Sequence, residues 1–240
     1  MELQFSNYEA NNKNNNLKRS MAIELDILFA GLFPHHEDKL LEFPQSLHPF
    51  CGRGIGIWQY PRQFSEYIDF LLTLNISSYM EVGVAAGGTF RFLTEFLSRY
   101  GNLNLSKAVD IAAPGQTYRG GENIFTKSFV DWLDASKVAE FVNVSDPGYK
   151  NLDFEKFDLI MIDGDHSYEG VLADFIKLRN CSKRYVFHDI VNSHTPGVTR
   201  FWEELKSGKY GDIKNTREFT YQYPEMDNKF MGIGYIEFEN

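Results

Sequence analysis

The feature that most limits how this chain can fold is a regular alternation of short apolar runs with helix-like stretches. The alternation extends from Tyr79 to Leu205. Repeated strand–helix units of this kind build a parallel sheet that is covered on both faces by helices. We therefore predict an α/β fold with strands over 79–84, 108–111, 141–144, 159–162 and 185–187, and helices over 89–99, 126–133, 170–178 and 198–205.

The end of the chain follows a different pattern. Two strand-like segments, 219–223 and 231–238, are joined by a polar loop with no helix between them. Segments connected in this way pair as a hairpin, which places an antiparallel strand in the sheet. We expect a mostly parallel, doubly wound sheet whose last strand runs in the opposite direction.

The first sixty residues lie outside the alternating pattern. Residues 1–20 include the Asn-rich run 11–16 and carry little apolar surface to offset chain ordering, so we expect a flexible polar N-terminus. Apolar spacing predicts a helix over 21–33 that ends before a proline. We expect residues 21–60 to form a helical and irregular extension, and residues 61–240 to form the main domain.

Composition and charge exclude several kinds of partner. The 240 residues suffice for one domain with a buried core. The formal charge of -9 would repel nucleic acid, and no window approaches the ~20 apolar residues of a membrane span. Two cysteines without zinc-type spacing, and an N-terminus without a secretory pattern, favour a cytoplasmic location. We expect a globular protein that binds neither nucleic acid nor membranes.

A glycine-rich turn follows the first predicted strand. Gly83, Gly87 and Gly88 lie between that strand and a helix that begins near Thr89. Glycines there permit positive φ and a close approach to a ligand, and the free N–H groups of the helix face the same space. These four residues are therefore candidates for cofactor binding at the carboxyl end of a strand. The alternative is that the glycines only form a tight corner.

Nearby polar residues bear on which ligand the turn would hold. Asp110 ends the second predicted strand, where a carboxylate can accept hydrogen bonds from ribose hydroxyls. Glu81, which we place in the turn, suits a ligand with a cationic group, such as S-adenosylmethionine. Ala85 stands where a dinucleotide motif needs its second glycine, so a methyl donor is favoured over NAD. Gln59, before the first strand, is a candidate to cover the donor or the acceptor.

Charged residues follow the fourth and fifth predicted strands. Asp163 and Asp189 are expected at one edge of the sheet, and converging carboxylates repel one another unless a cation joins them. A divalent ion is the simplest solution. His166 is a candidate general base, because imidazole can take a proton from a hydroxyl near a metal. Alternatively, Asp163 or Asp165 caps the next helix, and His188 bonds a backbone carbonyl.

The most specific sequence motif is Ile-Asp-Gly-Asp-His-Ser-Tyr-Glu-Gly at 162–170. With 81–83, 87–89, 188–189, 197–198 and 201–202, it makes the chain from about Gln59 onward resemble a class I S-adenosylmethionine-dependent methyltransferase. More narrowly, the chain resembles the group of macrocin-type sugar O-methyltransferases and cephalosporin-hydroxylase-like proteins. The resemblance implies a Rossmann-like, seven-stranded, mostly parallel sheet with an antiparallel last strand, and contacts to the methyl donor from Glu81, Gly83 and Asp110.

The resemblance also implies a metal site and a base. Metal-dependent relatives place ligands at the positions of Asp163, His188 and Asp189, and a base at the position of His166. A carboxylate or an amide is usual where this chain has His188. Because imidazole is a poor magnesium ligand, the options left open are magnesium, manganese, iron, a His188 that only supports a ligand, and a site without metal.

The expected function is metal-assisted O-methylation of a hydroxyl on a small molecule, with S-adenosylmethionine as the donor. The competing interpretations are an NAD(P)-dependent oxidoreductase, a metal-dependent hydrolase and a catalytically inactive methyltransferase-like binding module. The N-terminal helix and the aromatic residues around Phe50 offer a surface for a homodimer. A polar loop at 118–121 is either an active-site lid or simply a loop.

Overall fold

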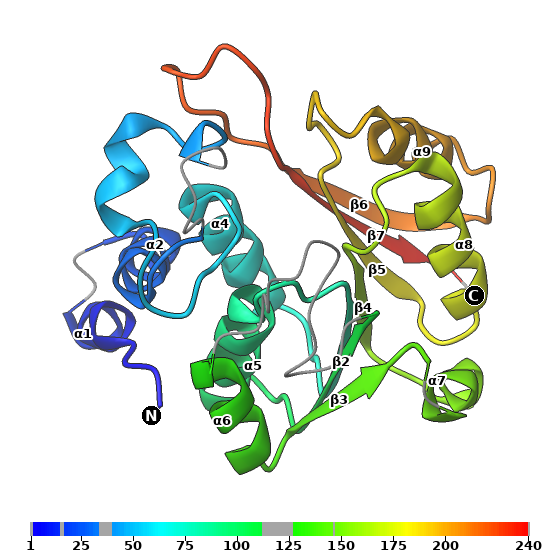
Figure 1. The fold of residues 1–240 in the computed structure, drawn as a ribbon, viewed down its shortest axis with the longest axis horizontal. Helices are drawn as coiled ribbons and strands as arrows, with labels where there is room; N and C mark the ends of the chain where they lie inside the picture. The colour runs from blue at the N-terminus through cyan, green and yellow to red at the C-terminus, as the bar shows by residue number, and fades with distance from the viewer. Residues whose placement is uncertain (1, 15–16, 34–39, 112–126, 146, 240) are drawn as a thin grey trace.

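The computed structural model describes residues 2–14, 17–33, 40–111, 127–145 and 147–239. Its centre is a seven-stranded sheet in the order β3-β2-β1-β4-β5-β7-β6 (Figure 1). The strands are β1 (Ser78–Val82), β2 (Leu105–Asp110), β3 (Ala139–Asn143), β4 (Leu159–Ile162), β5 (Arg184–His188), β6 (Ile213–Phe219) and β7 (Ile233–Phe238). The first five pair in parallel, and β7 pairs antiparallel with both β5 and β6. The Rossmann-like, mostly parallel sheet is therefore confirmed.

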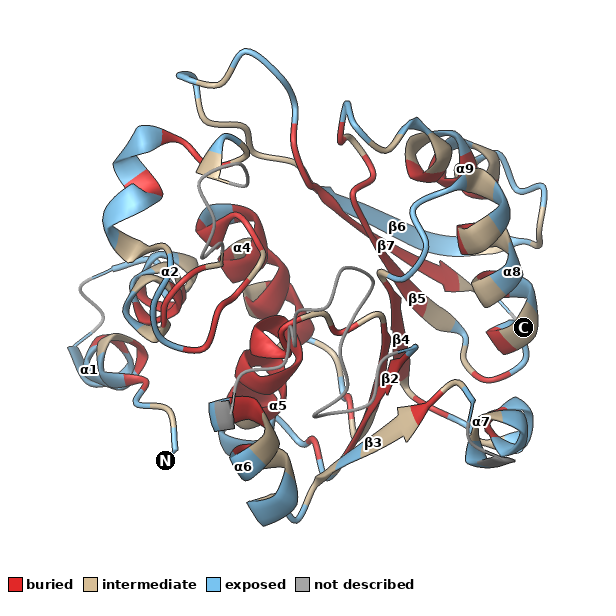
Figure 2. Ribbon diagram, in the orientation of Figure 1, coloured by how far each residue is buried: buried red, intermediate tan, exposed pale blue. Residues whose placement is uncertain are grey.

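The position of the sixth strand differs from the prediction. β6 spans Ile213–Phe219, whereas the apolar pattern placed this strand at 219–223. Most of its residues are exposed, and Figure 2 shows β6 in pale blue beside the buried β7. Hydrogen bonds to β7 hold this edge strand, so it can form with little apolar surface. Its sequence therefore lacks the apolar run on which the prediction relied.

Helices cover both faces of the sheet (Figure 1). On one face lie α4 (Pro61–Leu71), α5 (Gly88–Tyr100) and α6 (Lys127–Ala135). On the other lie α7 (Pro147–Asn151), the 3-10 turn η2 (Leu152–Phe154), α8 (Tyr168–Leu178) and α9 (Pro196–Lys206). None of the helices in the described ranges is long and apolar enough to cross a membrane.

Alternate residues of each central strand face the two helical layers. On β1, Tyr79 belongs to the hydrophobic cluster on the α4–α5 side, and Met80 belongs to the cluster on the α8–α9 side. Their partners on β4, Leu159 and Ile160, divide in the same way. Because both faces are buried, a shift in register would expose apolar side chains, and the register is therefore strongly fixed. This register brings the residues after β1, β4 and β5 to a common edge.

The N-terminal residues pack on the α4–α5 side of the sheet. α1 (Ser6–Asn14) lies within the stretch that we expected to be flexible, and it is followed by α2 (Arg19–Ala30) and the 3-10 helix η1 (Gln45–Phe50). Phe5 and Tyr8 are buried against aromatic residues of α5, and the Asp26 carboxylate accepts the N–H of Tyr8. Two aromatic side chains thus supply apolar surface that the Asn-rich composition concealed. The division of the chain at residues 20 and 60 stays a prediction.

Candidate functional site

The glycine turn connects β1 to α5 at the carboxyl edge of the sheet. Gly83 and Gly87 have φ values of 82° and 84°, and the N–H of Gly87 donates to the carbonyl of Val84 at 2.7 Å. Gly87 is the left-handed residue that precedes the first turn of α5. The expectation of positive φ at these two glycines is confirmed, and a side chain at either position would be strained.

The space beside the turn glycines is filled by the protein itself. A Cβ on Gly83 would lie 2.2 Å from the carbonyl oxygen of Asp163, and one on Gly87 would lie 2.3 Å from a ring carbon of Phe129. A Cβ on Gly88 would lie 2.4 Å from the carbonyl oxygen of Gly56, in the segment before α4. The tight-corner interpretation thus explains part of the glycine requirement, because internal packing already demands these residues. Thr89, in the first turn of α5, is buried.

Asp110 holds the glycine turn in place. Its Oδ2 accepts the N–H of Val84 at 2.9 Å and that of Ala85 at 3.3 Å. Ala85 has φ 45°, a left-handed conformation that costs energy for a residue with a side chain. The carboxylate at the end of β2 therefore stabilises the strained turn, beside the place where we expected it to contact a ribose.

Glu81 differs from its expected position. It lies inside β1, in register with Met161 of β4, and not in the turn itself. The carboxylate is 1% exposed and accepts the hydroxyl of Tyr79 at 2.5 Å. Burial raises the pKa of Glu81 to about 8, so the side chain is mostly uncharged at neutral pH. At neutral pH, Glu81 therefore largely lacks the negative charge that we expected to attract a sulfonium or an ammonium group.

Two aspartates and two histidines meet at the carboxyl ends of β4 and β5. Oδ1 of Asp163 accepts hydrogen bonds from Nε2 of His166 at 3.2 Å and from Nδ1 of His188 at 3.1 Å. The carboxylate of Asp189 lies 3.4 Å from Nδ1 of each imidazole. Asp189 has φ 63°, and backbone strain of this kind in a residue with a side chain is common at functional sites. The sequence predicted this meeting of side chains correctly.

The charges of this cluster shift its proton affinities. Burial alone would raise the pKa of Asp163, but the two imidazoles outweigh it and lower the pKa to about 2. Burial would lower the pKa of His188, but Asp163 and Asp189 outweigh it and raise the pKa to about 9. The same competition raises the pKa of His166, which is also the most exposed member at 42%. At neutral pH the cluster therefore holds an ionised Asp163 beside a charged His188.

The arrangement does not fit the divalent metal site that the sequence predicted. A protonated imidazole has no lone pair for a metal, and Asp163 uses one oxygen to bind both imidazoles. In the part of the chain that the structure describes, no group of three or more His, Cys, Asp and Glu side chains is arranged to hold a metal ion. Positive charge between the two carboxylates comes here from His188.

Helix capping after β4 falls to Ser167. Its hydroxyl accepts the N–H of Gly170 at 3.0 Å, which makes Ser167 the N-cap of α8. Asp165 accepts the N–H of Ser167 at 2.9 Å and so forms the turn before the helix. The helix cap that we considered for Asp163 or Asp165 is therefore wrong, because Ser167 takes that role and Asp165 only supports the turn before it.

Two of the predicted site residues, Gln59 and His188, have buried polar atoms that lack a partner among the described residues. Gln59 is 0% exposed, and neither its amide nitrogen nor its amide oxygen has a hydrogen bond; the same holds for Nε2 of His188. Buried polar atoms of this kind are costly unless a ligand or water satisfies them. The sequence analysis predicted a role for Gln59 but none for Phe129, which packs on Gly87. The apolar helical spacing of Phe129 does not distinguish it from an ordinary core residue. The candidate lid at 118–121 lies outside the described residues.

Comparison with known proteins supports the fold. Residues 80–190 match a family described as "Methyltransferase domain". Among solved structures, cofactor-bound Rv0187 from MTB is 12% identical, with a TM-score of 0.53, over 97% of this chain and 95% of that chain. The O-methyltransferase TomG from Streptomyces achromogenes, in complex with SAM, is 14% identical, with a TM-score of 0.50, over 92% of this chain and 100% of that chain. None of the curated proteins searched matches the sequence.

Over residues 80–190, the chain is therefore similar to a methyltransferase domain. It has the class I fold of S-adenosylmethionine-dependent methyltransferases, with β7 reversed against β5. The methyltransferase resemblance read from the sequence is confirmed to this level, and the roles of the individual site residues stay predictions.

Proposed function

We propose that this protein transfers the methyl group of S-adenosylmethionine to a hydroxyl on a small molecule. The observation that carries the proposal is the meeting of two features at one edge of the sheet. Gly83, in the glycine turn, lies directly against the backbone of Asp163. Asp163 belongs to the cluster of two aspartates and two histidines at the ends of β4 and β5. A methyl donor on the turn would therefore lie beside side chains that can activate an acceptor. O-methylation is also the activity stated for TomG, whose fold this chain shares.

Donor binding is assigned to the turn, to Asp110 and to Gln59. The N–H groups at the start of α5 and the carboxylate of Asp110 lie where a nucleoside would contact the edge of the sheet. Gln59 offers a buried amide donor and acceptor that have no partner within the described part of the chain. These groups bind and orient the donor, and alignment contributes a large share of an in-line methyl transfer.

Activation of the acceptor hydroxyl is assigned to His166. Nε2 of this imidazole donates to Asp163 at 3.2 Å, whereas Nδ1 lies 3.4 Å from the carboxylate of Asp189. Nδ1 is therefore the nitrogen that an incoming hydroxyl can approach. When Nδ1 takes the hydroxyl proton, the ionised Asp163 stabilises the resulting imidazolium. The hydroxyl oxygen then attacks the methyl carbon, and the neutral thioether leaves. The expected metal assistance forms no part of this proposal.

The acceptor is proposed to be a small molecule because the protein is acidic. A formal charge of -9 disfavours an RNA or DNA backbone. The match to a methyltransferase domain disfavours an oxidoreductase. An inactive binding module would still bind the donor at the glycine turn but would not transfer the methyl group. Two experiments separate these possibilities.

The first experiment tests donor binding by calorimetry with S-adenosylhomocysteine. Wild-type protein should bind it with micromolar affinity, and Asp110→Asn should weaken binding about tenfold, since the ribose contact loses its charge. Asp134→Asn, an exposed carboxylate on α6, is the matched control and should bind like wild type. If wild type takes up NAD and not S-adenosylhomocysteine, the donor assignment is wrong.

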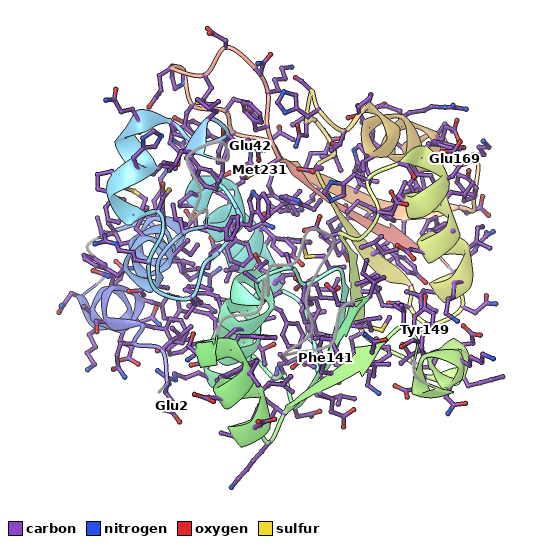
Figure 3. All side chains as sticks on the ribbon, viewed as in Figure 1. Glu2, Glu42, Phe141, Tyr149, Glu169 and Met231 are labelled. Atoms are coloured by element: carbon purple, nitrogen blue, oxygen red, sulfur yellow. The ribbon has the colours of Figure 1, made fainter. Side chains whose placement is uncertain are left out.

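The second experiment tests the base by following transfer of a labelled methyl group to a panel of hydroxyl compounds, with RNA as a negative acceptor. His166→Gln should lower kcat about 100-fold or more with little change in donor affinity. Glu169→Gln removes an exposed charge nearby on α8, where Figure 3 labels Glu169, and should keep full activity. Donor binding without transfer to any acceptor would favour the inactive module.

A further inference from the structure

The N-terminal arm, residues 2–14, is connected to α6 through two charged side chains of α5. The backbone N–H of Leu3 donates to Oε2 of Glu95 at 2.7 Å, and Oε1 of Glu95 accepts Nε of Arg91 at 2.8 Å. Nη1 of Arg91 donates to the carbonyl of Ser128 in the first turn of α6 at 3.2 Å. The side chains of Arg91 and Glu95 are only 5% and 10% exposed. The pair is therefore shielded from solvent screening, unlike most surface ion pairs.

The first turn of α6 in turn lies against the glycine turn. Phe129 follows Ser128 directly, and its ring fills the place that a side chain at residue 87 would need. Phe129 is buried and packs beside Phe90 and Trp132, with ring centroids 6.5 and 5.7 Å apart. A movement of this helical turn would therefore change the packing on Gly87. The contacts run without a break from the arm to the proposed donor site.

The arm is held on α5 by more than the Glu95 contact. The Phe5 ring packs edge-on against Phe92 and Phe96, with centroids 5.3 and 5.1 Å apart, and Nη1 of Arg99 donates to the carbonyl of Leu3 at 3.3 Å. Undocking the arm would break these contacts and would remove one hydrogen-bond donor from a nearly buried carboxylate. Glu95 would then hold Arg91 less firmly, because a buried charge depends on each of its partners.

We propose that the N-terminal arm positions the donor site, with Glu95 and Arg91 as the positioning residues that connect the docked arm to α6 and the glycine turn. The inference rests on the proposed function, because it concerns affinity for the same methyl donor. Two sites coupled in this way must act on each other equally. If a docked arm raises donor affinity, then the donor must stabilise the docked arm by the same factor.

Hydrogen exchange on the full-length wild-type protein tests this reciprocity. Saturating S-adenosylhomocysteine should slow exchange of the amides at Leu3 and Tyr8 about fivefold or more. Glu95→Gln should weaken S-adenosylhomocysteine binding in calorimetry by a similar factor. The matched control is Glu66→Gln, which breaks an exposed Arg–Glu pair of the same spacing on α4 and should bind like wild type.

Each outcome decides between the coupling and the donor assignment. Unchanged exchange in the arm at saturating S-adenosylhomocysteine, or equal affinities of Glu95→Gln and Glu66→Gln, would overturn the coupling and leave the donor assignment intact. Absence of any binding by wild type would overturn both. If Glu95→Gln fails to fold, Phe5→Leu serves instead, because it keeps an apolar side chain while loosening the arm, and it should also weaken binding about fivefold. A merely structural role for the arm would not make its exchange depend on the donor.

Discussion

Replacing Gly83 with alanine should destabilise the protein strongly, because two separate costs fall on one methyl group. The residue has φ 82°, and alanine in this left-handed region costs about 1–2 kcal/mol. Its Cβ would also lie 2.2 Å from the carbonyl oxygen and 2.5 Å from the carbonyl carbon of Asp163, both of which are backbone atoms. Relieving this overlap must separate the ends of β1 and β4, and overpacking of this kind costs about 1–3 kcal/mol.

The sum is about 2–5 kcal/mol, a large part of the ~5–15 kcal/mol by which a domain is stable. For a chain of this length, that loss corresponds to a fall in Tm of roughly 10 °C. Urea unfolding followed by circular dichroism measures it, and the midpoint should fall with an unchanged slope. Calorimetry should also show weaker binding of S-adenosylhomocysteine, because the turn and Asp163 are displaced together.

Gly148 provides the matched control for this experiment. It lies in α7, and a Cβ added there would meet no atom within 4 Å. Gly148→Ala should therefore leave stability unchanged or raise it by up to ~1 kcal/mol, as alanine does in helices. An unfolding free energy for Gly83→Ala within about 0.5 kcal/mol of wild type would refute the argument, since it would mean that the strand ends separate at almost no cost.

Three further predictions concern proton and metal chemistry. Asp163 helps to raise the pKa of His166, so kcat/KM should rise with pH, and the midpoint of that rise should lie above about pH 6.5. Asp163→Asn should move this midpoint to lower pH. A wild-type midpoint below about 6.5 would count against His166 as the base. Treatment with a chelator should change kcat less than about twofold, because His188 supplies the positive charge between the carboxylates; loss of activity that added magnesium or manganese restores would contradict this. The hydroxyl and N–H of Ser77 donate to the Asp158 carboxylate and lower its pKa despite burial. Asp158→Asn should therefore lower the free energy of unfolding by about 1 kcal/mol at pH 7. Urea titrations should show this difference disappearing as pH falls below about 4.

Much of the candidate site follows from the order of residues along the chain. Parallel strands end at the same edge of a sheet, so Asp163 and His188 had to meet once their strands were recognised from apolar runs. The glycine turn could also be predicted from the sequence, because Gly83 and Gly87 adopt the positive φ values that glycine permits. Local patterns of this kind are short-range, and the sequence records them directly.

Other features depend on partners that are distant in sequence. β6 is held by hydrogen bonds to β7 and needs no apolar run, so its position at Ile213–Phe219 was not visible in the pattern. Burial raises the pKa of Glu81 to about 8, and this shift could not be judged from the strand sequence alone. Asp163 binds two imidazoles, an arrangement that only coordinates reveal.

The sequence by itself thus determined the α/β class, the glycine turn and the edge of the sheet at which the polar residues meet. The tertiary structure alone decided which charges neutralise one another at that edge, and how the N-terminal arm reaches the turn through Glu95 and Arg91. The reason is physical. Periodicity and turn chemistry depend on neighbours a few residues away, whereas burial, proton affinity and ion pairing depend on every group that folding brings within a few ångströms.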